Sequence, residues 1–331
     1  MHYKTYADLS IDVLQGVTKL PKGLQLVVGV PRSGMVPAYM IAAQLNLPVT
    51  SLNAYLNGDY GSVGERHIRD KQTQLQRVLI VDDSVYSGTA ITKAKAQLGV
   101  LETDVEYCYC AVYSATEVCD FVDVYFKYVP TPRAFQWNYK NHFITTQSCY
   151  DIDGVLCVDP TEAENDDGVN YRKFLLEAKP LFIPSYTISC LVTSRLEKYR
   201  KETEAWLQAH KVSYSTLIML DLPDAKTRRS LNIHGKFKAE VYAKRSEAYF
   251  VESSWRQAKT IFRLSKKPVF CTENDVCITS EDDILYFDKK AFSMTSVLQY
   301  QLQHKHFKAI LYWLTPPILI VVLKKIKKIL K

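Results

Sequence analysis

Apolar runs and amphipathic segments alternate along the first 143 residues of this chain. The apolar runs rich in β-branched residues predict strands, and the segments with a helical period between them predict helices. The expected strands are Leu24–Val30, Val78–Val81 and Val105–Tyr113, and the expected helices are Val36–Leu45 and Ala90–Leu98. Such alternation is typical of a parallel sheet with helices on its faces.

A second series with the same alternation begins near Ile144. Its expected strands are the run before Asp151, Thr187–Val192, Ser215–Met219 and Ala248–Val251, and its expected helices are Val169–Ala178, Glu197–His210 and Lys238–Arg245. We therefore predict an α/β protein with two doubly wound domains, residues 1–143 and 144–300, followed by a tail, residues 301–331.

The tail carries the net charge of +7. It holds seven lysines and no acid from Gln301 onward, so residues 1–300 have 35 basic and 35 acidic residues. A neutral globular part argues against nucleic-acid binding. The uncharged run Ala309–Leu323 contains Pro316–Pro317 and is shorter than the roughly 20 residues of a membrane-spanning helix. It predicts an anchor at the membrane interface, although a core helix with a solvated basic end is an alternative.

The cysteines and the start of the chain bear on the compartment. None of the eight cysteines forms a CxxC pair, and no signal peptide opens the sequence. We expect reduced thiols and a cytoplasmic protein, peripheral to the inner face of the cytoplasmic membrane through its tail.

The first motif, Val78–Ala90, reads VLIVDDSVYSGTA. Its strand delivers Asp82 and Asp83 to the carboxyl edge of the sheet, where parallel sheets bind ligands. Paired carboxylates there can accept hydrogen bonds from two vicinal hydroxyl groups. The loop Ser84–Thr89 precedes a helix, so its backbone N–H groups and hydroxyls predict a cradle for a phosphate.

This motif resembles the signature of type I phosphoribosyltransferases, which bind 5-phosphoribosyl 1-pyrophosphate (PRPP) with Mg²⁺. The resemblance implies that Asp82 and Asp83 hold the ribose hydroxyls. It implies a pyrophosphate loop at Gly29–Gly34 (GVPRSG), a hood at Phe135–Trp137 and a lid at Asn57–Gln76. The implied PRPP contacts outside the two acids are Arg32, Ser33, Gly34, Ser84, Val85, Tyr86, Ser87, Gly88 and Thr89. The family usually has Thr where Tyr86 and Ala90 stand here.

The second motif, Cys149–Cys157, reads CYDIDGVLC. Asp151 and Asp153 follow a predicted strand and are separated by one residue. The first carboxylate can attack a phosphorus atom, and the second can protonate the leaving oxygen and later activate water.

The order of the later polar residues resembles the haloacid dehalogenase phosphatase superfamily. Thr193 and Glu252 end predicted strands, and Lys238 opens a predicted helix. The resemblance implies that Asp151 is the nucleophile, Asp153 the acid and base, and Thr193 and Lys238 the phosphate contacts. Mg²⁺ would lie between Asp151, Asp153 and Glu252. Ser253 stands where the family usually has a second acid, and Lys236 is an alternative to Lys238. The short gaps between motifs leave no room for a large cap domain.

Three functions are compatible with both resemblances. The first is transfer of 5-phosphoribose from PRPP to a glycan hydroxyl, followed by removal of the 5-phosphate. The two domains together resemble the two-domain ribofuranose-installing enzymes of bacterial O-antigen and capsule polysaccharide synthesis, which implies a lipid-linked glycan acceptor. The second is nucleobase salvage coupled to a nucleotide phosphatase, and the third is a non-enzymatic PRPP sensor. The acceptor sugar, its linkage, the carrier and any homo-oligomer stay open.

Overall fold

The computed structural model describes residues 1–61 and 75–288. Contacts divide the chain into one unit over Met1–Cys277 and a second that begins at Ile278. Most of the expected lid and the whole expected tail lie outside the described residues. No helix in the described ranges is long and apolar enough to cross a membrane.

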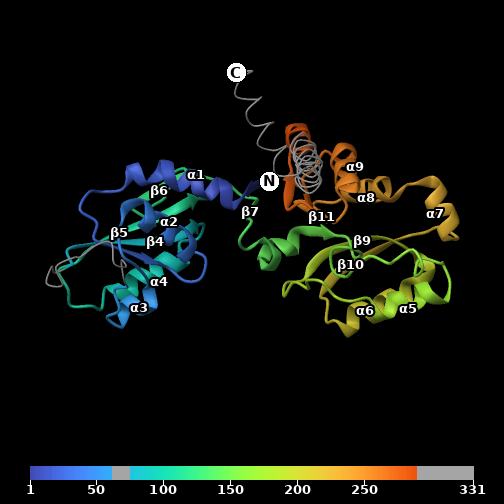
Figure 1. Ribbon diagram of the computed structural model, residues 1–331, viewed down its shortest axis with the longest axis horizontal. Coiled ribbons are helices and arrows are strands. Elements are labelled where there is room, and N and C mark those ends of the chain that lie inside the picture. Colours follow the sequence, from blue (N-terminus) through green and yellow to red (C-terminus); the bar gives the residue numbers. More distant parts are fainter. Residues whose placement is uncertain (62–74, 289–331) are drawn as a thin grey trace, which may run out of the picture. The chain divides into compact units, whose positions relative to one another are not determined.

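The first sheet is five-stranded and parallel, in the order β3-β2-β4-β5-β6 (Figure 1). Its strands are β2 (Leu26–Gly29), β3 (Val49–Ser51), β4 (Arg77–Val85), β5 (Glu106–Ser114) and β6 (Val124–Tyr128). Helices α1 (Tyr6–Gly16) and α2 (Met35–Leu45) cover one face, and α3 (Leu52–Leu56) and α4 (Thr89–Leu98) cover the other.

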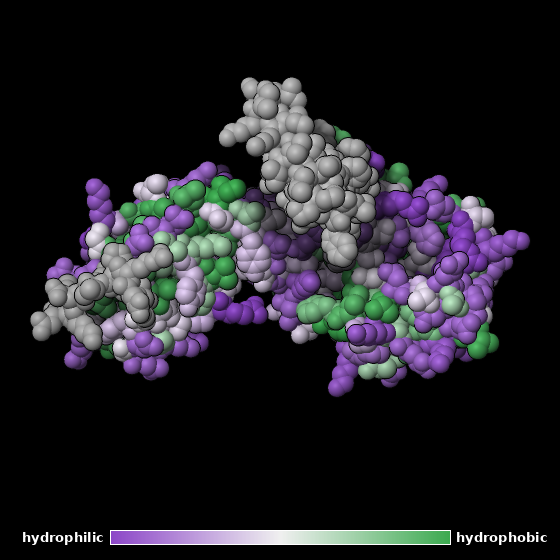
Figure 2. Space-filling model, in the orientation of Figure 1, coloured by the Kyte–Doolittle hydropathy of each residue, from purple (hydrophilic) through white to green (hydrophobic). Residues whose placement is uncertain are grey.

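Alternate residues of the central strands supply the two halves of this core. Leu79 and Val81 of β4 pack with α1 and α2, whereas Val78 and Ile80 pack with α3 and α4. This division follows from the two-residue period of a strand, and it explains why β4 reads as a continuous apolar run. Apolar side chains also remain exposed, including Ile11 of α1, and Figure 2 shows hydrophobic residues over α1 and α2.

The second sheet is six-stranded, in the order β10-β9-β8-β11-β12-β13. Its strands are β8 (Ser148–Tyr150), β9 (Ile188–Leu196), β10 (Tyr214–Leu220), β11 (Tyr249–Glu252), β12 (Val269–Cys271) and β13 (Val276–Ile278). The pairs from β10 through β12 are parallel. Helices α5 (Val169–Glu177) and α6 (Arg200–Ala209) cover one face through residues such as Phe174 and Trp206.

The opposite face of this sheet is covered by α8 (His234–Ala243) and α9 (Trp255–Ser265). Tyr242 of α8 contacts the ring of Phe250 in β11 at 5.6 Å between centroids. A short helix, α7 (Ala225–Leu231), precedes α8. The parallel α/β arrangement predicted from the alternation is therefore confirmed.

A small sheet and several short turns complete the described elements. Strand β1 (His2–Lys4) pairs in parallel with β7 (Arg133–Phe135). The 3-10 turns are η1 (Val17–Lys19), η3 (Tyr139–Asn141), η4 (Phe143–Gln147) and η5 (Glu197–Tyr199).

Three predicted boundaries differ from the structure. Strand β4 continues past both acids to Val85, and β9 continues past Thr193 to Leu196, because ladder pairing with the neighbouring strands extends that far. Helix α8 begins at His234, so Lys238 lies inside the helix and does not open it.

Candidate active sites

The first site lies where the five-stranded sheet reverses its winding. The chain runs from β2 outward to β3, and from β4 outward to β5 and β6, so the loops after β2 and β4 emerge side by side. Ligands of open parallel sheets bind at such a point. The loop after β2 contains the predicted pyrophosphate contacts, and the end of β4 contains the predicted acids.

The two acids of β4 share a buried environment. Asp82 is 7% exposed and Asp83 is 4% exposed. Burial, followed by the charge of Asp83, raises the pKa of Asp82 to about 8. Near neutral pH, Asp82 therefore tends to keep its proton.

Two hydrogen bonds from other segments orient the Asp83 carboxylate. Ser33 Oγ donates to one of its oxygens at 3.0 Å, and Trp137 Nε1 donates to the other at 2.6 Å. Ser33 belongs to the predicted pyrophosphate loop and Trp137 to the predicted hood. The structure thus brings three separately predicted segments together at one carboxylate.

The segment Ser84–Thr89 makes a tight entry into α4. Gly88 has φ +72°, and a Cβ atom there would lie 2.1 Å from the ring of Phe121, so only glycine fits. Ser87 Oγ and Thr89 Oγ1 are 2.9 Å apart, and Tyr86 is 65% exposed. Two hydroxyls beside a helix N-terminus suit a phosphate group.

The predicted pyrophosphate loop is held close to β4. A Cβ atom at Gly34 would lie 2.5 Å from the carbonyl oxygen of Val30 and 2.7 Å from that of Val81. The loop approaches the acidic strand this closely only because residue 34 has no side chain. Arg32 is exposed beside it.

The hood is fixed by aromatic stacking. The rings of Phe135 and Trp137 stack at 4.9 Å with an interplanar angle of 17°, and Tyr113 of β5 stacks on Phe135 at 5.3 Å. These contacts hold the Trp137 indole in the position from which it donates to Asp83.

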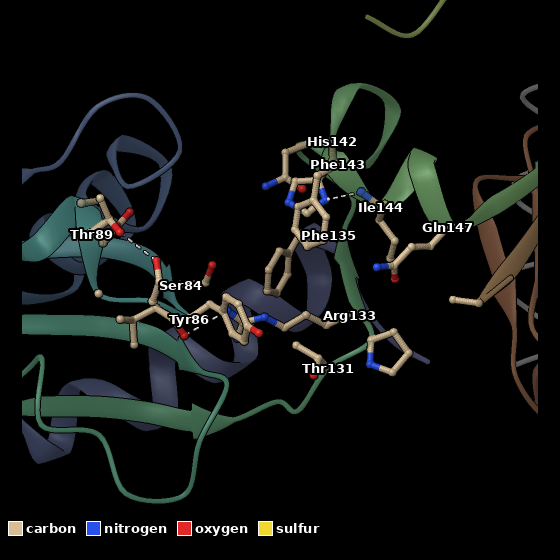
Figure 3. A pocket seen from close by; sticks show the side chains of 18 of the residues that line it. Ser84, Tyr86, Thr89, Thr131, Arg133, Phe135, His142, Phe143, Ile144 and Gln147 are labelled. Carbon is tan, nitrogen blue, oxygen red and sulfur yellow. Dashed lines mark hydrogen bonds between the residues drawn. The ribbon is translucent and has the colours of Figure 1, made fainter. Parts of the chain in front are cut away.

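A cavity of about 710 Å³ opens beside the segment Ser84–Thr89. Figure 3 shows Tyr86, Arg133 and Phe135 on one side of it and His142 and Phe143 on another. Its residues combine apolar rings with a few polar groups, which is usual for a site that binds an organic ligand.

His142 is one of the polar groups of this cavity. Burial lowers its pKa, so the ring is neutral near pH 7. The N–H of Ile144 donates to its Nδ1 at 3.3 Å. The neutral ring must then carry its proton on Nε2, which makes His142 a hydrogen-bond donor toward a ligand.

The second site occupies the same kind of position in the six-stranded sheet. The chain winds from β8 to β9 and β10 on one side and from β11 to β12 on the other, so the loops after β8 and β11 meet. Asp151 and Asp153 follow β8, and Glu252 ends β11.

Lys238 joins two of these acids. Its Nζ lies 2.6 Å from Asp151 and 2.7 Å from Glu252, and it also donates to Gln257 at 3.0 Å. The residue is 1% exposed, and the neighbouring carboxylates raise its pKa despite burial. Burial raises the pKa of Asp151 to about 7, while Lys238 opposes that rise. Lys236, in contrast, lies on the exposed face of α8, 3.9 Å from Glu240.

Sequence reasoning did not single out Arg195. Its Nη2 donates to Asp153 at 2.6 Å, and its Nε lies 3.2 Å from both oxygens of that carboxylate. The guanidinium is fully buried. A charged residue that ends the apolar run ISCLVTSR was the available signal, because an arginine in that position needs a buried anion.

The predicted phosphate contact Thr193 is fully buried, and its hydroxyl accepts from the N–H of Arg195 at 3.2 Å. The adjacent Ser194 lines a cavity of about 730 Å³ together with Asp151, Asp153 and Lys238. Asp159, another residue that sequence reasoning did not select, also lines it. Burial, with the charges of Asp153 and Glu252, raises the pKa of Asp159.

Oxygen atoms are the donors that this cavity offers to a metal ion. Among its lining residues the candidates are the carboxylates of Asp151 and Asp159 and the carbonyl of Asp153. Glu252, the other predicted ligand, is fully buried, with one oxygen bonded to Lys238 and the other to the N–H groups of Ser253 and Ser254. Within the described ranges, no cluster of three or more His, Cys, Asp or Glu is arranged to hold a metal. Mg²⁺ prefers oxygen and commonly keeps several waters beside one or two carboxylates. The donor type fits Mg²⁺ held in that open manner.

Comparison with known proteins identifies the first part of the chain. Residues 8–112 match the family model of a phosphoribosyl transferase domain. None of the curated proteins matches the chain.

Similar solved structures include the xanthine-guanine-hypoxanthine phosphoribosyltransferase of Helicobacter pylori, with 20% identity over 42% of this chain and 93% of that chain (TM-score 0.33). A purine phosphoribosyltransferase of Pyrococcus horikoshii has 20% identity over 41% and 92% (TM-score 0.31). A chain of a Pnkp1/Rnl/Hen1 complex has 14% identity over 82% and 97% (TM-score 0.27). The match over residues 8–112 supports a transferase that uses PRPP.

Proposed function

We propose that this protein transfers 5-phosphoribose from PRPP to a glycan hydroxyl and then removes the 5-phosphate from the product. The observation that supports a second step is the buried cluster in which Lys238 bridges Asp151 and Glu252. Beside it, Arg195 holds Asp153. A nucleophile, a second carboxylate and balancing cations at one sheet edge are what phosphomonoester hydrolysis needs.

In the transfer step, the bond between C1 of the ribose and the pyrophosphate oxygen breaks, and pyrophosphate leaves. The acceptor oxygen forms the new bond to C1, and its proton passes to the departing pyrophosphate. Asp82 and Asp83 would hold the ribose hydroxyls, and Ser87 and Thr89 would bind the 5-phosphate. Catalysis by these groups consists mainly of positioning and charge stabilisation.

In the hydrolytic step, a carboxylate oxygen of Asp151 would attack phosphorus. The bond from phosphorus to the sugar O5 breaks, and that oxygen takes a proton from Asp153. Asp153, now a carboxylate, then takes a proton from a water molecule that attacks the phosphorus of the phospho-aspartate, which releases inorganic phosphate and restores the Asp151 carboxylate. Arg195 would keep Asp153 beside the leaving oxygen.

Mg²⁺ is the proposed cofactor of both steps, and when bound it would neutralise phosphate charge. At the second site Asp151, the Asp153 carbonyl and Glu252 are the proposed holders. Lys238 partly neutralises the charge of the Asp151 and Glu252 carboxylates.

A purine or pyrimidine base is the second candidate acceptor. Phe135 and Phe143 line the first cavity, and aromatic rings can stack on a base as well as on a sugar. The glycan remains our first choice, since a hydrolytic site on the same chain and a basic apolar tail suit the building of a membrane-linked polysaccharide.

Product analysis tests the proposal. Wild type and Asp151→Asn are incubated with PRPP, Mg²⁺ and a panel of lipid-like glycan acceptors, and the products are weighed by mass spectrometry. We expect addition of ribose by wild type and of phosphoribose by Asp151→Asn. Turnover with free bases and none with glycans would replace the glycan by a nucleobase. Loss of transfer in Asp151→Asn would contradict separable sites.

The tail is proposed to place the enzyme at the inner face of the cytoplasmic membrane. Deletion of residues 301–331 should move the protein from the membrane fraction to the soluble fraction. An unchanged distribution would refute the anchor.

A further inference from the structure

The cavity of the second site contains an arginine that no carboxylate balances. Arg228 of α7 is 5% exposed, and it takes part in no ion pair within 4.0 Å among residues 1–61 and 75–288. Its Nη1 donates to the carbonyl of Ser194 at 3.0 Å, and its Nη2 donates to Asn165 Oδ1 at 3.1 Å. Both acceptors are neutral, and Nε has no hydrogen-bond partner in the described protein. A buried cation of this kind is costly unless an anion joins it.

Ser194, like Arg228, has a buried polar atom without a hydrogen-bond partner within the described ranges. In Ser194 this atom is the side-chain oxygen. Ser194 and Arg228 both line the 730 Å³ cavity that contains Asp151 and Asp153. Buried polar atoms without partners are uncommon in folded proteins, so two in one cavity point to a ligand that supplies the missing acceptor.

The other basic groups of this cavity are already committed or neutral. Lys238 is bound to Asp151 and Glu252. His234 also lines the cavity, and burial lowers its pKa to about 4, so it is uncharged near pH 7. Arg228 is therefore the cavity-lining cation whose charge remains available to a substrate.

We propose that Arg228 and Ser194 form an oxyanion subsite that binds the phosphate dianion of a phosphomonoester, in the position next to Asp151. This inference rests on the hydrolytic step proposed above. The guanidinium would neutralise oxygens of the phosphate that are not displaced, and the Ser194 hydroxyl would donate to one of them. Free inorganic phosphate, the product, has the same chemistry and would bind there too.

The position of α7 explains how the subsite is built without a large cap. The side chain of Asp224 accepts from the N–H of Thr227, which caps the helix, and the Asp167 carboxylate accepts from the N–H of Ala225. The bond to Asp167 fastens α7 to the loop that contains Asn165. Arg228 is thereby held over the cavity by a fixed turn of helix.

Calorimetric titration with inorganic phosphate tests the subsite. Because the segment Ser84–Thr89 also suits phosphate, every protein carries Ser87→Asp, which places a negative charge in that exposed loop. Arg228→Gln should weaken phosphate binding at least tenfold, and Ser194→Ala about threefold. Arg229→Gln is the matched control, since Arg229 is the exposed neighbour on the same helix, and it should change the affinity less than twofold.

A folded Arg228→Gln variant with unchanged phosphate affinity would refute the subsite, as would absence of phosphate binding in the parent protein. If Arg228→Gln does not fold, the phosphate affinity of Ser194→Ala tests the subsite instead. Loss of the Ser194 hydroxyl breaks no side-chain hydrogen bond in the described protein. A second arm measures hydrolysis of ribose 5-phosphate, for which Arg228→Gln should raise KM at least tenfold and change kcat less. If phosphate binds through Arg228 but no phosphomonoester is hydrolysed, the subsite stands and the proposed hydrolytic function fails.

Discussion

Replacement of Asp82 by asparagine should make the protein more stable, and the gain should grow with pH. The pKa of Asp82 is raised from 3.8 to about 8, first by burial and then by Asp83. The folded state therefore keeps a proton that the unfolded chain has lost between about pH 4 and pH 8. Stability from this group is fully present below the unfolded pKa and declines as pH rises through the folded pKa. The asparagine amide resembles the protonated acid and cannot ionise.

The magnitude follows from the size of this window. Each pH unit within it lowers the free energy of unfolding of wild type by about 1.4 kcal/mol, so the whole shift corresponds to an upper limit of about 6 kcal/mol. Relaxation of the acid pair reduces that limit, and we expect Asp82→Asn to gain roughly 2–4 kcal/mol over wild type between pH 5 and pH 8.

Urea unfolding without metal or PRPP at pH 5, 6.5 and 8 measures this difference. The exposed acid Asp104 supplies the control, and Asp104→Asn should show no comparable dependence on pH. A constant difference between Asp82→Asn and wild type across these pH values, or one that shrinks toward pH 8, would show that the carboxyl does not hold the extra proton.

Three further substitutions test the geometry of the sites. Gly34→Ala should cost roughly 2–4 kcal/mol in urea unfolding, because its Cβ would collide with backbone, and a neutral result would deny the close approach. Trp137→Phe keeps the stacking but removes the hydrogen-bond donor to Asp83, so kcat/KM for PRPP should fall about tenfold. An unchanged kcat/KM would show that this hydrogen bond does not contribute to the reaction of PRPP. Arg195→Lys cannot reproduce the forked contact with Asp153, so phosphate release should fall about 100-fold while pyrophosphate release persists, and equal losses would indicate general unfolding.

Much of the fold could be predicted from local patterns. Continuous apolar runs such as Val78–Val81 are buried on both faces, so they indicate a parallel sheet without knowledge of the neighbours. Acids placed directly after such runs must lie at the carboxyl edge. For this reason Asp82, Asp83, Asp151 and Asp153 could be selected from sequence alone.

Contacts between distant segments could not be predicted in this way. Trp137 reaches Asp83 across 54 positions, and Arg195 reaches Asp153 across 42. Arg228 had no signal, because it stands in a short polar helix that resembles any exposed turn. Side-chain reach depends on packing of whole elements, which a one-dimensional pattern does not contain. The choice between Lys236 and Lys238 likewise needed the direction of each side chain around α8.

The close approach of Gly34 to the backbone of β4 has a consequence for ligand recognition. The predicted pyrophosphate loop and the acids are rigidly connected, since Ser33 is hydrogen-bonded to Asp83 and the backbone beside Gly34 touches that of β4. Two halves of a ligand that are covalently joined would then meet a surface whose spacing is already set. Separate ribose 5-phosphate and pyrophosphate molecules would each have to lose their own translational freedom to occupy it. Such a fixed spacing would select a ligand by the distance between its diphosphate and ribose groups, as well as by the charge of those groups.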